Sequence, residues 1–108
     1  MRELPEAINT MRDKIVAAVP LERLYLFGSY AYGTPHKDSD FDFFLVVPDG
    51  GMEPLEAAHQ AHSALIHMPD YSPVDIMANY SSKFNALAKF PTMARKIVRE
   101  GVLLYEHN

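Results

Sequence analysis

The sequence predicts a single domain of the α/β (α+β) class over residues 1–108. Apolar runs of strand length alternate with stretches in which apolar residues recur at steps of three and four, the spacing of an amphipathic helix. A chain of this length has room for one hydrophobic core, and domains of this size commonly fold alone. No internal repeat, low-complexity segment or linker divides the sequence, so we expect all elements to share one domain.

The first half of the chain predicts a helix, a strand, a short helix and a second strand. Pro20 ends the first helix, whose apolar positions are Leu4, Ile8, Met11, Ile15 and Val19. Leu24–Phe27 is wholly apolar and flanked by turn signals, as is typical of a buried strand. Ser29–Tyr32 is expected to form a short helix that Gly33–Pro35 breaks. Phe41–Val47 is rich in aromatic and β-branched residues and predicts a strong strand.

The second half predicts three helices and two further strands. A helix is expected from about Glu53 to Ile66, before a break at Met68–Asp70, with an inner face made of Leu55, Ala58, His62 and Leu65. Val74–Met77 predicts a short strand, and Ser81 is the expected N-cap of the next helix. Pro91 is expected to begin another helix, which Gly101 ends. Val102–Tyr105 predicts a closing strand.

Composition and charge exclude several classes of protein. The formal net charge is −4, and no run of lysine and arginine is longer than Arg95–Lys96, so the chain lacks the basic surface on which tight nucleic-acid binding depends. The absence of cysteine excludes disulfides and thiol nucleophiles. No run approaches the roughly 18 apolar residues of a membrane span, and the N-terminus lacks a secretory pattern. We expect a cytoplasmic protein with no membrane association.

The segment from Leu24 to Val47 carries the most specific motif. Gly28 and Ser29 end an apolar strand, where backbone N–H groups and a hydroxyl can bind phosphate. Ten residues later, Asp40 and Asp42 open the next strand on one face, because strand side chains alternate with period 2. Carboxylates there need a cation, and Mg²⁺ prefers a few carboxylates plus water and substrate phosphates. The combination predicts a nucleotidyl-transfer site in which Gly28 and Ser29 bind the triphosphate while Asp40 and Asp42 bind Mg²⁺, with two ions expected.

Asp75 is the expected third carboxylate of this site. It stands alone in the apolar stretch PVDIM, where an unpaired charge is costly. If its strand lies beside the Asp40–Asp42 strand, Asp75 completes the metal site or acts as the base on the incoming hydroxyl. The alternative is an edge-strand residue that points into water.

Other aspartate-rich sites fit the order of residues less well. Asp38, Asp40 and Asp42 imitate the start of a calcium-binding loop, but Phe43 stands where that loop needs glycine. Phosphatases with an aspartyl nucleophile carry Asp-x-Asp after a strand, whereas here the strand follows, and the same objection weakens a glycosyltransferase-type motif. The Walker-type phosphate loop is absent.

The stretch GSYAYGTPHKDSDFDFFLVV resembles the signature of the DNA polymerase beta-type nucleotidyltransferase superfamily: Gly-Ser, ten residues, then Asp-x-Asp. The short chain is similar to the minimal (MNT-type) members from about Leu4 to Tyr105. The resemblance is concentrated in Gly28, Ser29, Asp40, Asp42 and Asp75. It implies a small mixed β-sheet flanked by helices, Mg²⁺, and transfer of a nucleoside monophosphate to a hydroxyl. It also implies a partner, since many minimal members are antitoxins of HEPN-type toxins and some add AMP to a toxin tyrosine.

One position departs from the family pattern. Many relatives have arginine where this chain has Tyr32, so the departure bears on triphosphate binding and nucleotide choice while the carboxylates are kept. Lys37 and Lys83 are weaker candidates for a phosphate contact. The three histidines of the central helical region are expected to have structural or surface roles: His59, His62 and His67.

We therefore predict a Mg²⁺-dependent nucleotidyltransferase antitoxin that transfers AMP from ATP, or a monophosphate from another nucleoside triphosphate, to a tyrosine of a HEPN-type toxin. Larger relatives bind the base and the acceptor with a second domain. A partner subunit or a homo-oligomer is therefore expected to supply the surfaces that bind them here. Two alternatives stay open: an antitoxin that neutralises its toxin by binding alone, and an enzyme that modifies a small molecule such as an aminoglycoside.

Overall fold

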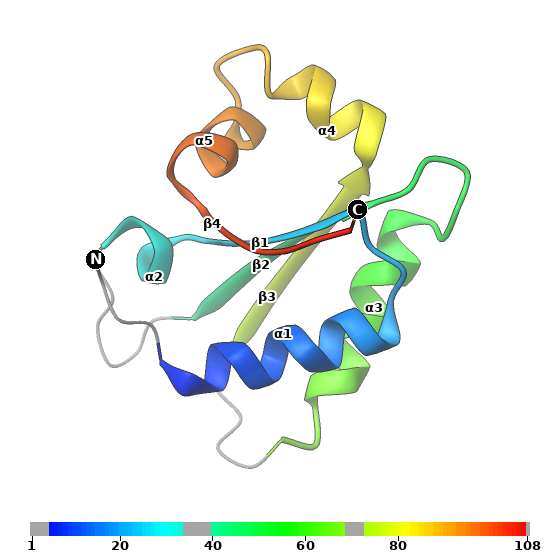
Figure 1. The fold of residues 1–108 in the computed structure, drawn as a ribbon, viewed down its shortest axis with the longest axis vertical. Coiled ribbons are helices and arrows are strands. Elements are labelled where there is room, and N and C mark those ends of the chain that lie inside the picture. The colour runs from blue at the N-terminus through cyan, green and yellow to red at the C-terminus, as the bar shows by residue number, and fades with distance from the viewer. Residues whose placement is uncertain (1–4, 34–39, 69–72, 108) are drawn as a thin grey trace.

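The computed structural model describes residues 5–33, 40–68 and 73–107. They form a four-stranded sheet in the order β3-β2-β1-β4 with helices on both faces (Figure 1). The expected mixed sheet flanked by helices is thus confirmed. In chain order the elements are α1 (Glu6–Ala18), β1 (Arg23–Phe27), α2 (Ser29–Tyr32), β2 (Phe41–Val47), α3 (Pro54–Leu65), β3 (Val74–Tyr80), α4 (Ser81–Leu87), α5 (Met93–Glu100) and β4 (Val102–Glu106).

The strand directions bring several strand ends to the same end of the sheet. β2 and β3 are parallel, while β1 is antiparallel to both β2 and β4. Parallel neighbours need a crossover connection, usually a helix, and α3 supplies it between β2 and β3. The last residues of β1 therefore lie at the same end of the sheet as the first residues of β2 and β3. We call this the α2 end of the sheet, because α2 follows β1 there (Figure 1).

Alternating strand side chains fill two cores, one on each face of the sheet. The first core lies against α1 and α3 and includes the strand residues Leu24, Leu26, Phe41, Phe43, Leu45 and Val47. The second lies against α4 and α5 and contains Tyr25, Phe27, Phe44, Val46, Phe84, Ala94 and Ile97. The rings of Phe44 and Phe84 anchor α4 on this face, with centroids 4.9 Å apart. Because the faces alternate, Asp42 lies on the same face as Phe44.

The predicted inner face of α3 is correct at Leu65 and wrong at Leu55, Ala58 and His62, which are not buried. The helix buries Ala57, Ala61 and Leu65, whereas Leu55 is 83% exposed. Small and apolar residues occur on both sides of this helix, so their spacing does not identify the buried side. The predicted helix start at Leu4 and the predicted breaks at Thr34–Pro35 and Pro69–Asp70 fall outside the described residues.

The third strand is longer than predicted, and this moves the start of α4. β3 reaches Tyr80 because its pairing with β2 continues to the end of that strand, with Tyr80 opposite Val47. Ser81 is therefore the first residue of α4 and not its N-cap. Asp49, in the turn after β2, binds the helix start instead: its Oδ1 accepts a hydrogen bond from the Ser82 N–H at 3.0 Å.

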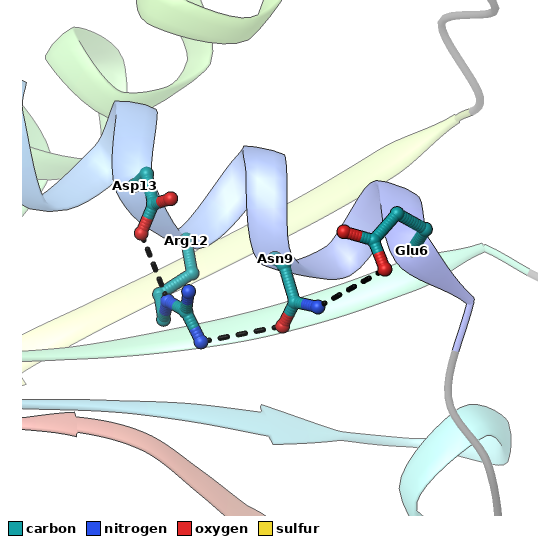
Figure 2. A network of polar contacts seen from close by, with 4 residues as sticks. All are labelled: Glu6, Asn9, Arg12 and Asp13. Carbon is teal, nitrogen blue, oxygen red and sulfur yellow. Dashed lines mark hydrogen bonds and ion pairs between the residues drawn. The ribbon is translucent and has the colours of Figure 1, made fainter.

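The outer side of α1 carries a short chain of polar contacts (Figure 2). Asn9 donates to Glu6 at 3.5 Å, and Arg12 donates to Asn9 at 3.2 Å. Arg12 also forms an ion pair with Asp13 at 3.0 Å. Exposed contacts of this kind contribute under about 1 kcal/mol each, so burial of Ile8, Met11 and Ile15 holds the helix in place. Within the described ranges, none of the helices combines the length and apolar character that crossing a bilayer requires.

Candidate functional site

Four chain segments meet at the α2 end of the sheet. β1 ends opposite the beginning of β2, with Phe27 paired to Asp42. β3 begins beside β2, with Val74 paired to Phe41. β4 starts directly after α5, and its first residue, Val102, pairs with Leu26 near the end of β1. The end of α5 is therefore held close to the Gly28–Ser29 turn, and this convergence makes the candidate site.

Asp42 and Asp75 are direct partners in the parallel pairing of β2 and β3. Each is followed by an apolar residue of the first core, Phe43 or Ile76, so both carboxylates lie on the opposite face, which α4 and α5 cover. Asp42 is half-buried and Asp75 is exposed. The structure thus places Asp75 next to the Asp40–Asp42 strand, as the three-carboxylate hypothesis requires.

Electrostatic repulsion accompanies this arrangement. Burial, together with the negative charges of Asp75 and Asp40, raises the pKa of Asp42 from 3.8 to about 6. Asp40 immediately precedes β2 and is exposed. A half-buried carboxylate facing two others is unfavourable when ionised, and a bound cation would remove the penalty.

The Gly28 backbone lies directly against the Asp42 carboxylate. A Cβ placed on Gly28 would fall on Asp42 Oδ2 and 2.8 Å from its Cγ. Gly28 also has φ of +76° and ψ of −159°, a conformation that side-chain-bearing residues rarely adopt. The carbonyl of Gly28 accepts the Tyr32 N–H at 2.9 Å, which closes the turn onto α2. The glycine of the Gly-Ser motif is thus required both by its backbone conformation and by the close approach of Asp42.

The side chains present fit a hard divalent cation. Mg²⁺ is usually bound by a few carboxylates, with water and substrate phosphates completing its octahedron. Within the described ranges, no three or more His, Cys, Asp or Glu side chains are grouped so that they could hold a metal ion together. Asp42 and Asp75, which are paired across β2 and β3, would contact such an ion as two ligands from one side and leave its other positions to water and phosphate oxygens.

Two predicted phosphate contacts receive no support. Lys37 lies outside the described residues. Lys83 is at the wrong end of the sheet, because Asp75 is near the start of β3 and Lys83 follows its last residue, Tyr80. A strand of 7 residues at about 3.3 Å per residue separates them by roughly 20 Å.

Sequence analysis did not identify Lys96 and Glu100 of α5 as neighbours of the site. The Lys96 ammonium lies 4.6 Å from the centroid of the Tyr32 ring. Burial raises the pKa of Tyr32, a hydrogen bond from the Gly28 backbone opposes the rise, and the charges of Glu100 and Asp42 add to it. No local motif indicates this contact, since α5 reaches the site only through the pairing of β4 with β1.

The Nucleotidyltransferase domain family matches residues 8–104, nearly the whole chain. The chain belongs to this family. The predicted fold and enzyme class are thereby confirmed, because the match includes both strands that carry the motif. The individual roles of the five predicted residues, Gly28, Ser29, Asp40, Asp42 and Asp75, stay predictions.

Solved structures similar to this nucleotidyltransferase domain include a protein from Sulfolobus solfataricus described as a nucleotidyltransferase. Its TM-score is 0.63 at 17% identity, over 93% of this chain and 78% of that one, which shows a shared fold. A mutant of the toxin-antitoxin MntA-HpeT gives 0.57 at 26% identity, over 93% and 73%. A toxin-antitoxin with AMP-PNP gives 0.57 at 25%, over 93% and 74%. No curated protein sequence matches the chain.

Proposed function

We propose that this nucleotidyltransferase is an antitoxin that transfers AMP from ATP to a hydroxyl of its toxin, a tyrosine hydroxyl on a HEPN-type protein. Two similar structures are toxin-antitoxins, and one of them was solved with AMP-PNP. The mutant among them has glutamate in place of two aspartates that are two positions apart. That is the spacing of Asp40 and Asp42 in this chain.

The observation that carries this proposal is the pairing of Asp42 with Asp75 beside the Gly28 turn. The turn offers a phosphate-binding backbone, and the carboxylates offer hard oxygen ligands on the same side of the sheet. Mg²⁺ held there would neutralise charge on the triphosphate and on the departing pyrophosphate. Neither feature alone distinguishes nucleotidyl transfer from simple metal or phosphate binding.

The proposed reaction forms one bond and breaks one. The acceptor oxygen attacks the α-phosphorus of ATP and forms the new O–P bond. The bond from that phosphorus to the α,β-bridging oxygen breaks, and pyrophosphate leaves. The acceptor proton passes to a carboxylate. Asp75 suits this role better than Asp42 because it is exposed, so that a hydroxyl on another protein can reach it.

A transfer assay with the protein encoded by the neighbouring reading frame tests this proposal. We expect label from [α-³²P]ATP to appear on that partner when Mg²⁺ is present. Asp42→Asn should reduce the transfer rate at least a hundredfold, because it removes a charged group on which phosphoryl-transfer electrostatics depend. Asp49→Asn is the matched control, since Asp49 lies beyond the other end of β2, and it should leave the rate unchanged.

Neutralisation by binding alone predicts a different result. In that case a variant in which both Asp40 and Asp42 are replaced by asparagine would still protect cells from the toxin, and no label would be transferred by the wild type. Transfer to an aminoglycoside, with none to the partner, would instead assign the site to small-molecule modification.

A further inference from the structure

Lys96 of α5 is an exposed lysine whose ammonium lies over the aromatic ring of Tyr32. Its ammonium lies 4.6 Å from the centroid of Tyr32, within the distance of a cation–π interaction. In the described part of the chain, no carboxylate forms an ion pair with this lysine. Its position is thus fixed by a contact with a ring, which does not neutralise its charge.

The position of Tyr32 links this lysine to the candidate phosphate site. Tyr32 is the last residue of α2, and its N–H donates to the Gly28 carbonyl at 2.9 Å. The Tyr32 side chain also lies close enough to the Gly28 backbone and to Asp42 for both to influence its hydroxyl. A cation on the face of this ring is therefore next to the turn rather than on a remote surface.

The candidate site carries an excess of negative charge, which a lysine would offset. Asp40, Asp42 and Asp75 are all acidic, and Glu100 acts on the Tyr32 hydroxyl from α5. A nucleoside triphosphate adds further negative charge. Two arginines on this face of the sheet are held elsewhere: Arg23 binds Asn85 and Tyr25, and Arg95 binds the carbonyl of Lys89.

We propose that Lys96 binds the non-transferred phosphates of the triphosphate, and that Tyr32 positions its ammonium for this contact. The inference rests on the proposed function, since it names a substrate-binding residue of the same site. A lysine donates up to three hydrogen bonds from one compact charge, so it can bind the β- and γ-phosphates without fixing their geometry. In this arrangement the ring and the lysine, which come from α2 and α5, form one phosphate-binding unit.

Equilibrium dialysis with ATP and with inorganic tripolyphosphate tests this inference. Ca²⁺ replaces Mg²⁺ in the assay to suppress turnover. Lys96→Met should weaken binding of both ligands about tenfold, because one charge-assisted contact is lost, while AMP binding changes less than twofold. Lys96→Arg should restore most of the affinity.

Lys89→Met is the matched control, since it removes the same charge from an exposed position at the far end of the α4–α5 connection. It should leave all affinities unchanged. Tyr32→Phe should retain ATP binding within about threefold because the ring remains, whereas Tyr32→Leu should weaken it toward the Lys96→Met level. Circular dichroism checks that each variant is folded.

Equal affinities for Lys96→Met and Lys89→Met would overturn the role of Lys96 while leaving the proposed function intact. Equal losses for AMP and tripolyphosphate would also overturn it, because they would indicate a general change in the site. If the wild-type protein bound neither ATP nor tripolyphosphate, the proposed function would fail together with this inference.

Discussion

An aspartate and a glycine with positive φ lie near each end of strand β2. The surroundings of the two aspartates shift their pKa values in opposite directions. At the α2 end, burial and the charges of Asp75 and Asp40 raise the pKa of Asp42 to about 6. At the far end, hydrogen bonds from the side chain and backbone of Ser82 lower the pKa of Asp49. Asp49 therefore accepts hydrogen bonds from Ser82, whereas Asp42 lies near the carboxylates of Asp75 and Asp40.

The comparison separates a structural carboxylate from one that the proposed function assigns to a ligand. Asp49 stabilises the start of α4, because its Oδ1 accepts the Ser82 N–H at 3.0 Å. Burial and the neighbouring acids raise the pKa of Asp42, so we expect its ionised form to be unfavourable in the ligand-free protein. Such a cost is typical of functional sites, where the missing positive charge arrives with the ligand.

The two glycines differ in the same way. Gly28 and Gly50 have nearly equal φ values of +76° and +77°. A Cβ on Gly50 would meet nothing within 4 Å, whereas a Cβ on Gly28 would fall on the Asp42 carboxylate. Backbone conformation alone therefore requires glycine at position 50. At position 28 the close approach of the Asp42 carboxylate adds a second requirement.

The largest effect on stability is expected from Gly28→Ala. It should lower the free energy of unfolding by about 3 kcal/mol, since backbone strain and displacement of Asp42 add together. Gly50→Ala should lower it by about 1 kcal/mol through strain alone. Urea denaturation of both variants measures the difference. Equal losses would show that the Asp42 carboxylate does not lie against the turn.

A smaller effect of opposite sign is expected from Asp42→Asn in the metal-free protein. Because the folded-state pKa of about 6 lies above the usual 3.8, the folded protein binds more protons than the unfolded chain between these values. Wild-type stability therefore falls as pH rises through this window. At pH 8 the variant should be more stable by about 1 kcal/mol, a value reduced for solvent screening of the partly exposed carboxyl. The gain should disappear near pH 4.

Asp49→Asn should give the smallest change in stability, with a pH dependence opposite to that of Asp42→Asn. The pKa of Asp49 is lowered, so its contribution to stability is present above the usual pKa of an aspartate and is lost as pH falls through the folded-state value. The variant should melt slightly below wild type at neutral pH and approach it in acid. Thermal melts in EDTA at several pH values compare the two variants. A destabilising Asp42→Asn at pH 8 would contradict the proposed repulsion.

The α2 end of the sheet could be predicted well from sequence because its determinants are local. The period of 2 in Phe41–Val47 separates Asp42 from the first core, and the glycine before Ser29 marks the turn. The position of Asp75 followed once β3 was placed beside β2. The first two inferences use neighbours along the chain, and the third needs only one strand pairing.

The remaining features depend on tertiary contacts. The buried side of α3 is set by its packing under the sheet, and small residues on both sides conceal it. The length of β3 is set by its pairing with β2, which carries Lys83 away from the site. The contact of Lys96 with Tyr32 joins residues more than sixty positions apart, so no spacing in the sequence indicates it.

We expect the α2 end of the sheet to bind a metal–nucleotide complex and the far end to bind none. Titration of ¹⁵N-labelled protein with Mg²⁺ and AMP-PNP tests it most directly through backbone amide shifts. Metal-dependent shifts are expected at Gly28, Asp42 and Asp75, with Gly50 and Ser82 unchanged. Shifts confined to Gly50 and Ser82, or none at either end under saturating ligand, would contradict it.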